Sequence, residues 1–258
     1  MPNVVVACFS PTRSTRRLAE TVGGAVAAEL GAATATVDFT LPAARPTCVE
    51  CGTGDVLVFG FPVYAGRVPV LVANEVARWE GDGATAVIAG VYGNRDFDDA
   101  LVEAADLLAA QGFRVAAAGA FVAEHSSTRK VATGRPDTDD LAVAERFGRK
   151  AAARIASGAA ATPAIRGNRP YKEHPAAMDI RPQTTDACTA CGACIARCPM
   201  GVIHADDPAV VDAGCIRCNA CVKSCPEDAK FFDDDFSNMI RARLEGHFTA
   251  RREPELFL

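Results

Sequence analysis

Eight of the eleven cysteines in this 258-residue chain belong to two copies of one spacing, Cys-x2-Cys-x2-Cys-x3-Cys, and each copy is followed directly by proline. Every member of the first copy recurs 27 residues later, so this segment contains an internal repeat. Thiolates that converge from a tight loop bind iron–sulfur clusters, and this spacing is typical of bacterial [4Fe–4S] sites. The eight candidate ligands are Cys188, Cys191, Cys194, Cys198, Cys215, Cys218, Cys221 and Cys225.

The order of these cysteines predicts which of them share a cluster. In the bacterial two-cluster arrangement, the fourth cysteine of each copy binds the cluster of the other copy. We therefore expect two [4Fe–4S] clusters. The first ligand set is Cys188, Cys191, Cys194 and Cys225. The second ligand set is Cys215, Cys218, Cys221 and Cys198.

Disulfides and structural zinc are the two alternative uses for so many cysteines. Disulfides are typical of short secreted chains, whereas this chain begins MPNVVVACFS, without a basic segment followed by an apolar stretch of signal-peptide length. Structural zinc is usually bound by two pairs of ligands with a longer spacer between them. Two tight runs that each end in Cys-Pro favour iron–sulfur clusters over both alternatives.

The composition narrows the class of protein further. Apolar residues make up 49% of the chain, which is ample for a buried core, and the net charge of −5 argues against a general nucleic-acid binder. No apolar run approaches the ~18 residues that a membrane span needs. We therefore expect a cytoplasmic protein, in a reducing compartment that keeps thiolates available, with neither a nucleic-acid nor a membrane partner.

Short apolar runs alternate with helical patterns over residues 1–157. The longest helical pattern carries Leu18, Val22, Val26 and Leu30 at four-residue spacing, which is typical of a helix with one apolar stripe. Alternating strands and helices predict a parallel sheet covered by helices on both faces. We expect strands at 3–9, 33–39, 55–61, 84–92 and 113–122, and helices at 14–30, 69–79, 97–112 and 138–157.

The pattern predicts an α/β domain over residues 1–157 with a doubly wound, five-stranded parallel sheet. Five strands fit the flavodoxin-like class and equally half of a larger nucleotide-binding fold. We expect residues 158–186, rich in proline, to be a linker that packs on the protein, because its Tyr171 and Ile180 are too apolar for a free tether.

Two further segments follow the linker. Residues 187–230 form a small α+β two-cluster domain, which must depend on its clusters for stability because it is too short for a large hydrophobic core. Residues 231–258 form a helical tail that packs on the body. Its apolar residues recur at four-residue spacing, as Phe236, Ile240, Leu244 and Phe248.

Three loops follow strands at the edge where open α/β sheets bind their ligands. The loop at 10–15 places four hydroxyl groups beside a helix start, where free N–H groups and the helix dipole attract an anion. It lacks both the G-x-G-x-x-G and the G-K-[ST] fingerprints, and Ser and Thr also serve simply as helix caps. The other two loops read GFPVYAGRVP at 60–69 and YGNRDFDD at 92–99.

These three loops together resemble the FMN site of flavodoxin-like proteins. The whole chain resembles fusions of such a domain with a C-terminal bacterial two-[4Fe–4S] ferredoxin domain. The resemblance rests on PVYAGR at 62–67, YGNR at 92–95, GNRPY at 167–171 and the cysteine pattern.

The resemblance implies one non-covalent FMN with a site that can be named residue by residue. Its phosphate would be bound by the hydroxyl and N–H groups of Ser10, Thr12, Ser14 and Thr15. One side of the isoalloxazine would be lined by Pro62, Val63, Tyr64, Ala65 and Gly66, with Tyr64 as the best stacking candidate. The other side and the polar edge of the ring would be lined by Gly93, Asn94, Arg95 and Phe97, with Asp98 near the ring or the ribityl chain.

Several residues near this site have more than one interpretation. Flavodoxins usually have glycine where this chain has Arg13, which could add charge to the phosphate but does not share the tolerance of glycine for positive φ. Arg67 and Arg95 could balance the charge of a reduced flavin or be surface arginines. His125, after the fifth strand, could relay a proton, contact the cluster domain or be a plain loop histidine.

Cys48 and Cys51 form a C-x-x-C ahead of the third strand. Such a pair could be a redox dithiol. We expect inert thiols instead, because no thioredoxin-like context follows.

These features predict an electron-transfer protein that passes electrons between two [4Fe–4S] clusters and FMN, and so couples one-electron and two-electron chemistry. Its partner would be a redox protein, either a ferredoxin-type donor or an oxidoreductase acceptor, and a homodimer is compatible with the sequence. A flavoenzyme that reduces a quinone, nitro compound or enone, with the clusters as electron supply, is the alternative, and a redox sensor or scaffold is a third reading. Direct oxidation of NAD(P)H is disfavoured, because no nicotinamide-binding fingerprint is present.

Overall fold

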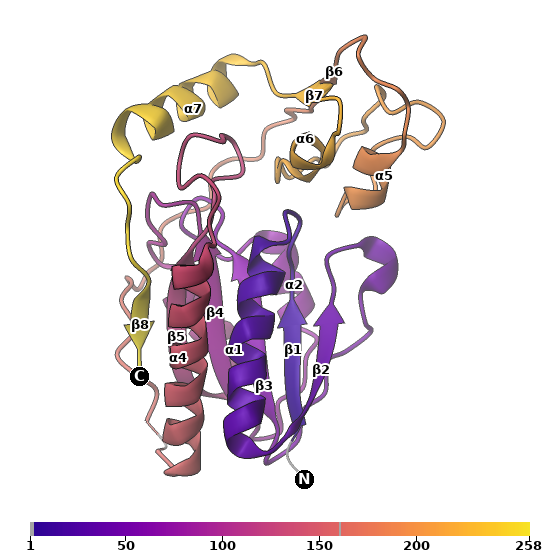
Figure 1. Cartoon of the computed structure of the whole chain (residues 1–258). Helices are drawn as coiled ribbons and strands as arrows, with labels where there is room; N and C mark the ends of the chain where they lie inside the picture. Colours follow the sequence, from indigo (N-terminus) through magenta and orange to yellow (C-terminus); the bar gives the residue numbers. More distant parts are fainter. Residues whose placement is uncertain (1–2, 160) are drawn as a thin grey trace.

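The computed structural model describes residues 3–159 and 161–258, and its first half is an α/β domain (Figure 1). Five parallel strands form the sheet in the order β2-β1-β3-β4-β5. This order is the flavodoxin-like one, so it decides between the two fold classes that the number of strands leaves open. The strands are β1 Asn3–Cys8, β2 Ala33–Asp38, β3 Val56–Pro62, β4 Thr85–Tyr92 and β5 Arg114–Val122.

Helices cover both faces of the sheet, and each face encloses its own hydrophobic core. On one face the core includes Leu18, Val22 and Phe147, and on the other it includes Trp79 and Leu101. Because side chains of a strand alternate between the two faces, the central strand β3 is buried along nearly its whole length. The helices are α1 Ser14–Leu30 and α4 Thr138–Ala156 on the first face, and α2 Val70–Val76 and α3 Ala100–Ala110 on the second.

The expected strands and helices of this domain are present, with shifts at two helix ends. Helix α2 ends at Val76, three residues before the expected end, and α3 begins at Ala100, three residues after the expected start. The second shift is informative, because the residues ahead of α3 form a loop at the ligand-binding edge. A short 3-10 helix, Pro42–Ala44, follows β2.

The linker is attached to the α/β domain by a buried carboxylate just before α3. Asp99 accepts hydrogen bonds from the backbone N–H and the side-chain amide of Asn168, at 2.7 and 2.9 Å. Its other carboxylate oxygen accepts from the backbone N–H of Lys172 at 2.7 Å. Burial opposes the charge of Asp99, but these hydrogen bonds outweigh it and lower the pKa of the carboxyl group.

Asp106, which lies on α3 itself, is a second carboxylate that binds this part of the linker. Asp106 accepts from two guanidinium nitrogens of Arg169, at 2.8 and 2.6 Å, and from the hydroxyl of Tyr171. The GNRPY segment is therefore packed along α3.

The cluster domain lies above the edge of the sheet where the parallel strands end (Figure 1). Its core is small, and cysteines supply much of it: Cys194, Cys198 and Cys221 pack with Ile203 and Val211. Its elements are β6 Gln183–Thr184, α5 Ala193–Arg197, α6 Ala220–Ser224 and β7 Lys230–Phe231, with β6 and β7 antiparallel.

The C-terminal tail contains a helix, α7 Asp235–His247, followed by a short strand, β8 Glu255–Phe257. Asp234 caps the helix by accepting from the N–H of Ser237 at 2.9 Å, and Leu244 is its buried residue. Strand β8 pairs with β5 in antiparallel orientation and adds a sixth strand to the sheet. The helical tail expected over residues 231–258 does not include this strand, because three residues at a sheet edge leave little periodic signal.

None of the helices among the described residues is long and apolar enough to cross a membrane.

We expect Asp99→Ala to lower the free energy of unfolding by on the order of 3 kcal/mol, because it removes a charged acceptor and leaves backbone donors of the linker without partners. Urea unfolding of the anaerobically purified chain measures this loss. Glu173→Ala, an exposed change in the same linker, is the control and should stay within about 0.5 kcal/mol of the parent. Equal stabilities of both variants would show that the linker is not held by Asp99.

Candidate functional site

Three loops come together at the carboxyl edge of the sheet, as parallel strands require. They follow β1, β3 and β4 at residues 9–13, 63–69 and 93–99. The second and third loops are joined by a hydrogen bond from the N–H of Asp99 to the carbonyl of Gly66, at 3.0 Å. This edge is also the switch point between β1 and β3, where flavodoxin-like folds bind their ligand.

In the first loop, one hydroxyl group is hydrogen-bonded within the fold, and two others remain near the surface. The backbone N–H of Ser10 donates to Thr40 Oγ1 at 2.7 Å, and its Oγ accepts from the N–H of Arg16 at 2.9 Å. Among residues 3–159 and 161–258, the only hydrogen bond of the Thr12 and Ser14 hydroxyls is the one between them, at 3.2 Å. Ser10 therefore shapes the loop, while Thr12 and Ser14 remain available to an anion at the start of α1.

Arg13 adopts the left-handed conformation, with φ of 69°, immediately before α1. The loop thus keeps the positive φ that a glycine would supply at this place, at a cost of about 1–2 kcal/mol for a residue with a Cβ atom. Thr15, in the first turn of α1, is buried. The Arg13 substitution therefore leaves the geometry of an anion-binding loop intact.

The second loop is a tight turn that requires glycine. Tyr64 and Arg67 exchange backbone hydrogen bonds of 3.1 and 3.0 Å, and the residues between them, Ala65 and Gly66, have φ of 53° and 83°. A Cβ atom at Gly66 would lie 2.0 Å from an oxygen of Asp98. The turn places Pro62, Val63 and Tyr64 along one rim of the edge.

The third loop is held by the C-terminal tail. The side-chain amide of Asn94 donates to the carbonyls of Phe248 and Ala250, at 2.7 and 2.8 Å, and its oxygen accepts from the N–H of Arg252 at 3.2 Å. The side chain of Asn94 is buried, and both its amide group and its oxygen are hydrogen-bonded to the tail. A ligand at this edge could therefore be bound only by the backbone of Asn94.

Phe97 does not line the edge of the sheet. Its ring is fully buried and meets Tyr92 and Phe257 edge-on, at centroid distances of 5.8 and 6.2 Å. The guanidinium of Arg166 lies 3.9 Å above the same ring. Phe97 is therefore a core residue, and its apolar character, not a ligand, explains its place in the motif.

The charged residues of the two later loops are paired within the protein. Asp98 accepts from Arg95 at 2.9 Å and from Lys172 Nζ at 3.0 Å. Arg67 donates through Nε and Nη2 to the two oxygens of Glu103, at 2.7 and 2.8 Å, in a buried ion pair. Arg67 and Arg95 are therefore both paired with carboxylates, and neither presents an unpaired charge at the ligand-binding edge. The ion pair of Arg67 with Glu103 links the turn after β3 to α3.

The cysteine repeat of the sequence is also a repeat of backbone shape. Ahead of α5, Ala190 and Gly192 have φ of 51° and 75°, and ahead of α6, Arg217 and Asn219 have φ of 53° and 60°. These left-handed residues turn the chain tightly at the same place in both copies of the cysteine repeat. All eight predicted ligands are free thiols, in agreement with their use by a metal cluster and not by disulfides.

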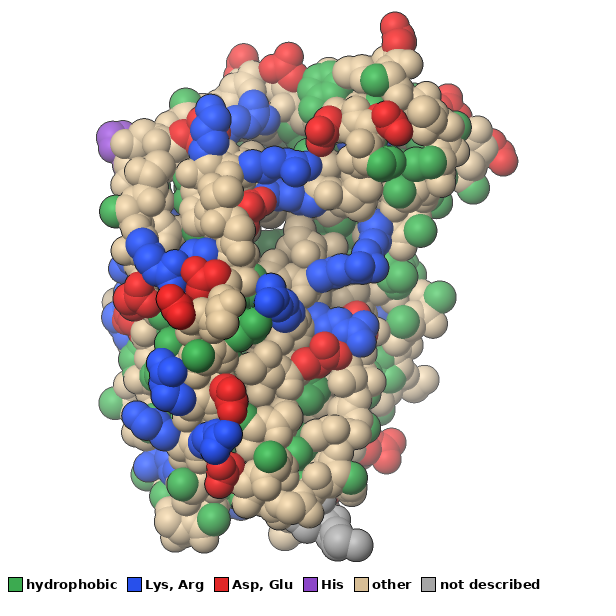
Figure 2. Space-filling model, viewed as in Figure 1, with side chains coloured by type: hydrophobic (Ala, Val, Ile, Leu, Met, Phe, Trp, Pro, Cys, Tyr) green, Lys and Arg blue, Asp and Glu red, His purple; other side chains and the backbone are tan. Residues whose placement is uncertain are grey.

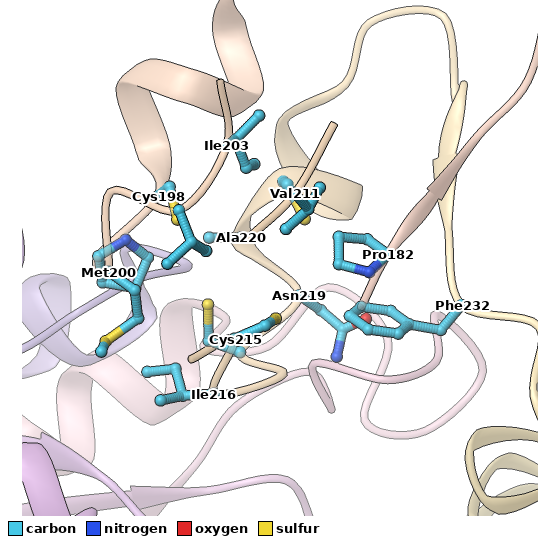
Figure 3. A pocket seen from close by; sticks show the side chains of 14 residues that line it. Pro182, Cys198, Met200, Ile203, Val211, Cys215, Ile216, Asn219, Ala220 and Phe232 are labelled. Carbon is cyan, nitrogen blue, oxygen red and sulfur yellow. The ribbon is translucent and has the colours of Figure 1, made fainter. Parts of the chain in front are cut away.

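A cavity in the cluster domain is lined by all four members of the second ligand set (Figure 3). Cys198 reaches it from the first repeat, as the crossing of the fourth ligand requires. The rest of the wall is almost entirely apolar, with Met200, Ile203, Val211 and Phe232 among the lining residues. Four sulfur donors in an apolar setting fit an iron–sulfur cluster.

Burial opposes thiolate formation in this cavity. It raises the pKa of Cys221 to about 12 and that of Cys218 further, with small contributions from the neighbouring cysteines. A bound iron–sulfur cluster would supply the positive charge that a buried thiolate needs, so metal binding and proton release would be coupled here. Within residues 3–159 and 161–258, no three His, Cys, Asp or Glu side chains converge as ligands of a single ion.

The second ligand set lies against the turn after β3. Burial, followed by the nearby Cys218 and Cys215 thiols, raises the pKa of Tyr64 well above its usual range. Ile216, between those two cysteines in sequence, packs against the core of the α/β domain together with Val63. The cavity of the cluster domain and the predicted flavin rim are therefore neighbours.

Polar contacts fix the cluster domain in this position. Lys223 of α6 forms an ion pair with Glu124, and Arg45 donates to the carbonyl of Pro199. Thr128 donates to Glu245 of α7 at 2.6 Å. These partners lie about 100 residues apart or more in the chain, so no local pattern of residues predicts them.

His125 lies at the same edge, between the two domains. Its ring packs on Gly93, where a Cβ atom would come within 2.4 Å of the ring. Its Nδ1 accepts from the N–H of Ser127 at 3.1 Å, so a neutral ring carries its proton on Nε2. Burial, reinforced by the charges of Lys223 and Arg95, lowers the pKa of His125 to about 4.

The remaining cysteines are poor nucleophiles. Burial raises the pKa of Cys8 to about 12 and that of Cys51 to about 11, and it also raises the pKa of Cys48. These directions agree with the expectation of inert thiols at Cys48 and Cys51, because thiolate is the reactive form.

Comparison with known proteins agrees with the two-part architecture. Residues 187–230 match the family of 4Fe-4S dicluster domains. The chain therefore joins a domain with the flavodoxin-like strand order to a segment that matches 4Fe-4S dicluster domains.

Similar solved structures are distant in sequence. A flavodoxin from the domain Archaea is 16% identical with a TM-score of 0.43, over 60% of this chain and 99% of that one. A Streptococcus pneumonia TIGR4 flavodoxin is also 16% identical with a TM-score of 0.40, over 59% and 99%. A flavone reductase is 12% identical with a TM-score of 0.46, over 63% and 66%. No curated protein has a sequence that matches this chain.

The lowered pKa of His125 predicts a loss of stability in acid. A histidine whose pKa in the folded state lies below its unfolded value of 6.5 binds fewer protons when folded, so the protein loses stability as the pH falls below 6.5. At pH 5.5 the loss is about 1 kcal/mol. Unfolding at pH 7.5 and 5.5 should show a smaller drop for His125→Gln than for the parent, and an unchanged drop for His247→Gln, which alters an exposed histidine. Equal drops in all three proteins would contradict the assignment.

Proposed function

We propose that this chain is an electron-transfer protein that binds FMN at the three loops and two [4Fe–4S] clusters at the two ligand sets. It exchanges single electrons with a redox protein partner through the clusters and passes them to or from the flavin within one chain. When bound, the clusters supply one-electron redox chemistry and FMN couples it to two-electron chemistry.

The chemistry of the first loop supports FMN. Thr12 and Ser14 offer hydroxyls with no other partner than each other, and they stand at the start of a 17-residue helix, where unpaired N–H groups attract a phosphate. Thr15 adds the next hydroxyl and N–H group. A single terminal phosphate suits this loop, because no second nucleotide-binding unit precedes the linker.

The two rims support a flat ring next to the phosphate. Pro62, Val63 and Tyr64, with the tight turn at Ala65 and Gly66, form one rim. The backbone of Gly93 and Asn94, with the paired side chains of Arg95 and Asp98, forms the other. The left-handed φ of 65° at Asn94 turns its N–H and carbonyl groups away from a regular strand, where they can meet the polar edge of a ring.

The observation that carries the proposal is a packing contact between the two domains. Ile216, which lies between Cys215 and Cys218 of the second ligand set in sequence, packs against the core of the α/β domain, as does Val63 of the turn after β3. A cluster held there would lie beside the proposed isoalloxazine rim. Cys191, of the first ligand set, is exposed, which favours entry of electrons from a partner at the first cluster and their relay through the second.

The first test is the identity of the cofactors. Anaerobically purified protein should contain about eight irons per chain, and flavin released by heat should be FMN on HPLC. Four irons per chain, stoichiometric zinc, or FAD in place of FMN would overturn the corresponding assignment.

Replacement of both Thr12 and Thr15 by Val should weaken FMN binding, since each charge-assisted hydrogen bond contributes about 1.5–3 kcal/mol. Fluorescence titration of the deflavinated protein measures the change. Thr21→Val, which alters a threonine six residues beyond Thr15 in α1 whose hydroxyl donates to the carbonyl of Arg17, is the matched control and should bind FMN as the parent does. If FMN binds the double variant with parental affinity, its phosphate does not sit in the first loop.

The decisive experiment follows electrons inside the chain. A fast one-electron donor reduces the clusters, and stopped-flow absorbance follows the flavin. Its reduction rate should not depend on protein concentration, because both cofactors belong to one chain. Cys218→Ser should abolish this phase, whereas Cys48→Ser, a cysteine outside both ligand sets, should keep it. A rate that rises with protein concentration would mean that electrons pass between molecules.

A further inference from the structure

A wide hollow lies between the α/β domain and the cluster domain. It is formed by the first loop, the start of α1 and the segment after β2, and Arg197 of α5 bounds it from the cluster domain. We call it the basic hollow, because four of the side chains that line it are arginines: Arg13, Arg16, Arg17 and Arg197. Figure 2 shows Lys and Arg side chains gathered where the two parts of the molecule face each other.

The basic hollow is distinct from the proposed flavin site. Its lining shares Ser10 and Arg13 with that site but includes neither Thr12, Ser14 nor Thr15. The two rims of the ring, at 62–67 and 93–98, do not contribute to it either. The hollow and the proposed flavin site therefore meet only at the first loop, through Ser10 and Arg13.

The charges of the hollow do not balance. Its two carboxylates, Glu20 and Asp38, both pair with Arg16, at 2.8 and 3.3 Å. In the described part of the chain, Arg13 and Arg197 form no ion pair, and Arg17 donates only to the carbonyl of Pro136, at 3.0 Å. A concave surface with excess positive charge concentrates anions, and it stands out in a chain of net charge −5.

The lining also suggests the kind of anion. Guanidinium groups bind phosphate oxygens in pairs, with two parallel hydrogen bonds. Beside them the hollow offers apolar surface from Pro11, Ala44 and Leu41, and the side chain of Leu41 is unusually exposed for its type, at 37%. An anion with a flat or apolar part fits this combination better than an inorganic ion.

We propose that the basic hollow binds a small phosphate ester of the nucleotide class. Arg17 and Arg197 bind its phosphates from the two domains, Arg13 adds positive charge from the first loop, and its base rests on Leu41 and Ala44. The ligand bridges the α/β domain and the cluster domain. This site goes beyond the proposed electron transfer and does not depend on which flavin the protein holds.

The position of Arg197 gives the site a second consequence. Arg197 precedes Cys198 of the second ligand set and follows Cys194 of the first by three residues. A phosphate held by Arg197 adds negative charge near both clusters, which makes the addition of an electron less favourable. By linkage, reduction of the clusters must weaken binding of the phosphate ester by the same factor.

Calorimetric titration of the cofactor-loaded full chain with ADP tests the proposal. ADP should bind at one site per chain, more tightly than pyrophosphate, which lacks a base for Leu41. Arg197→Ala should weaken ADP binding at least tenfold, or about 1.4 kcal/mol. Arg243→Ala is the matched control, because it removes an exposed arginine of α7 that forms no ion pair among the described residues, and it should bind ADP as the parent does. Reduction of the protein by dithionite should weaken ADP binding.

Two results would overturn the proposal: no binding of ADP to the parent protein, or equal weakening by both arginine variants. FMN content, measured on the same samples, separates this inference from the proposed function. Loss of FMN from Arg197→Ala would make the hollow a part of the flavin site and sink the inference alone. ADP binding by a protein that holds no FMN would support the inference and contradict the proposed flavin.

Discussion

Carboxylates on and just before α3 hold the linker against the α/β domain. Glu103 accepts two hydrogen bonds from Arg67 and one from the N–H of Val68, in a buried site. Arg67 also donates to the carbonyl of Lys172 in the linker and lies 4.9 Å from the ring of Tyr171. Since a buried charge without a partner is costly, this network couples the turn after β3, α3 and the linker. The cluster domain begins further along the chain and is held by contacts of its own, such as the ion pair of Lys223 with Glu124.

The cluster domain is too small to be stabilised by its hydrophobic core alone. Its core contains cysteines in the places that larger domains fill with aliphatic side chains, and a buried thiol contributes little apolar area. Iron–sulfur ligation therefore supplies both the cross-links and the charge compensation that this core lacks. The apolar wall that raises the pKa of the cysteines would also shield a bound cluster from water. In the proposed function, the stability and the activity of this domain depend on the same sulfur atoms.

The ligand-binding edge concentrates backbone strain. Arg13, Ala65, Asn94 and Asp98 all have positive φ, although none of them is a glycine. Such conformations persist where surrounding contacts determine them more strongly than local preference does, and here the contacts are long-range. The tail fixes Asn94, and Arg95 and Lys172 fix Asp98. Strand β8 therefore does more than widen the sheet, because it anchors the segment that holds the third loop.

The parts of this protein that depend on neighbouring residues can be predicted from its sequence. The cysteine spacing, the alternation of strands and helices and the hydroxyl-rich loop are local patterns, and each fixes a local geometry. Long-range pairing is visible only in the folded chain. There Phe97 lies in the core, Arg67 pairs with Glu103, the side chain of Asn94 holds the tail, and β8 joins the sheet. Ile216 also packs against the core of the α/β domain. Such contacts depend on charges and shapes from segments about 100 residues or more apart, which no short motif can encode.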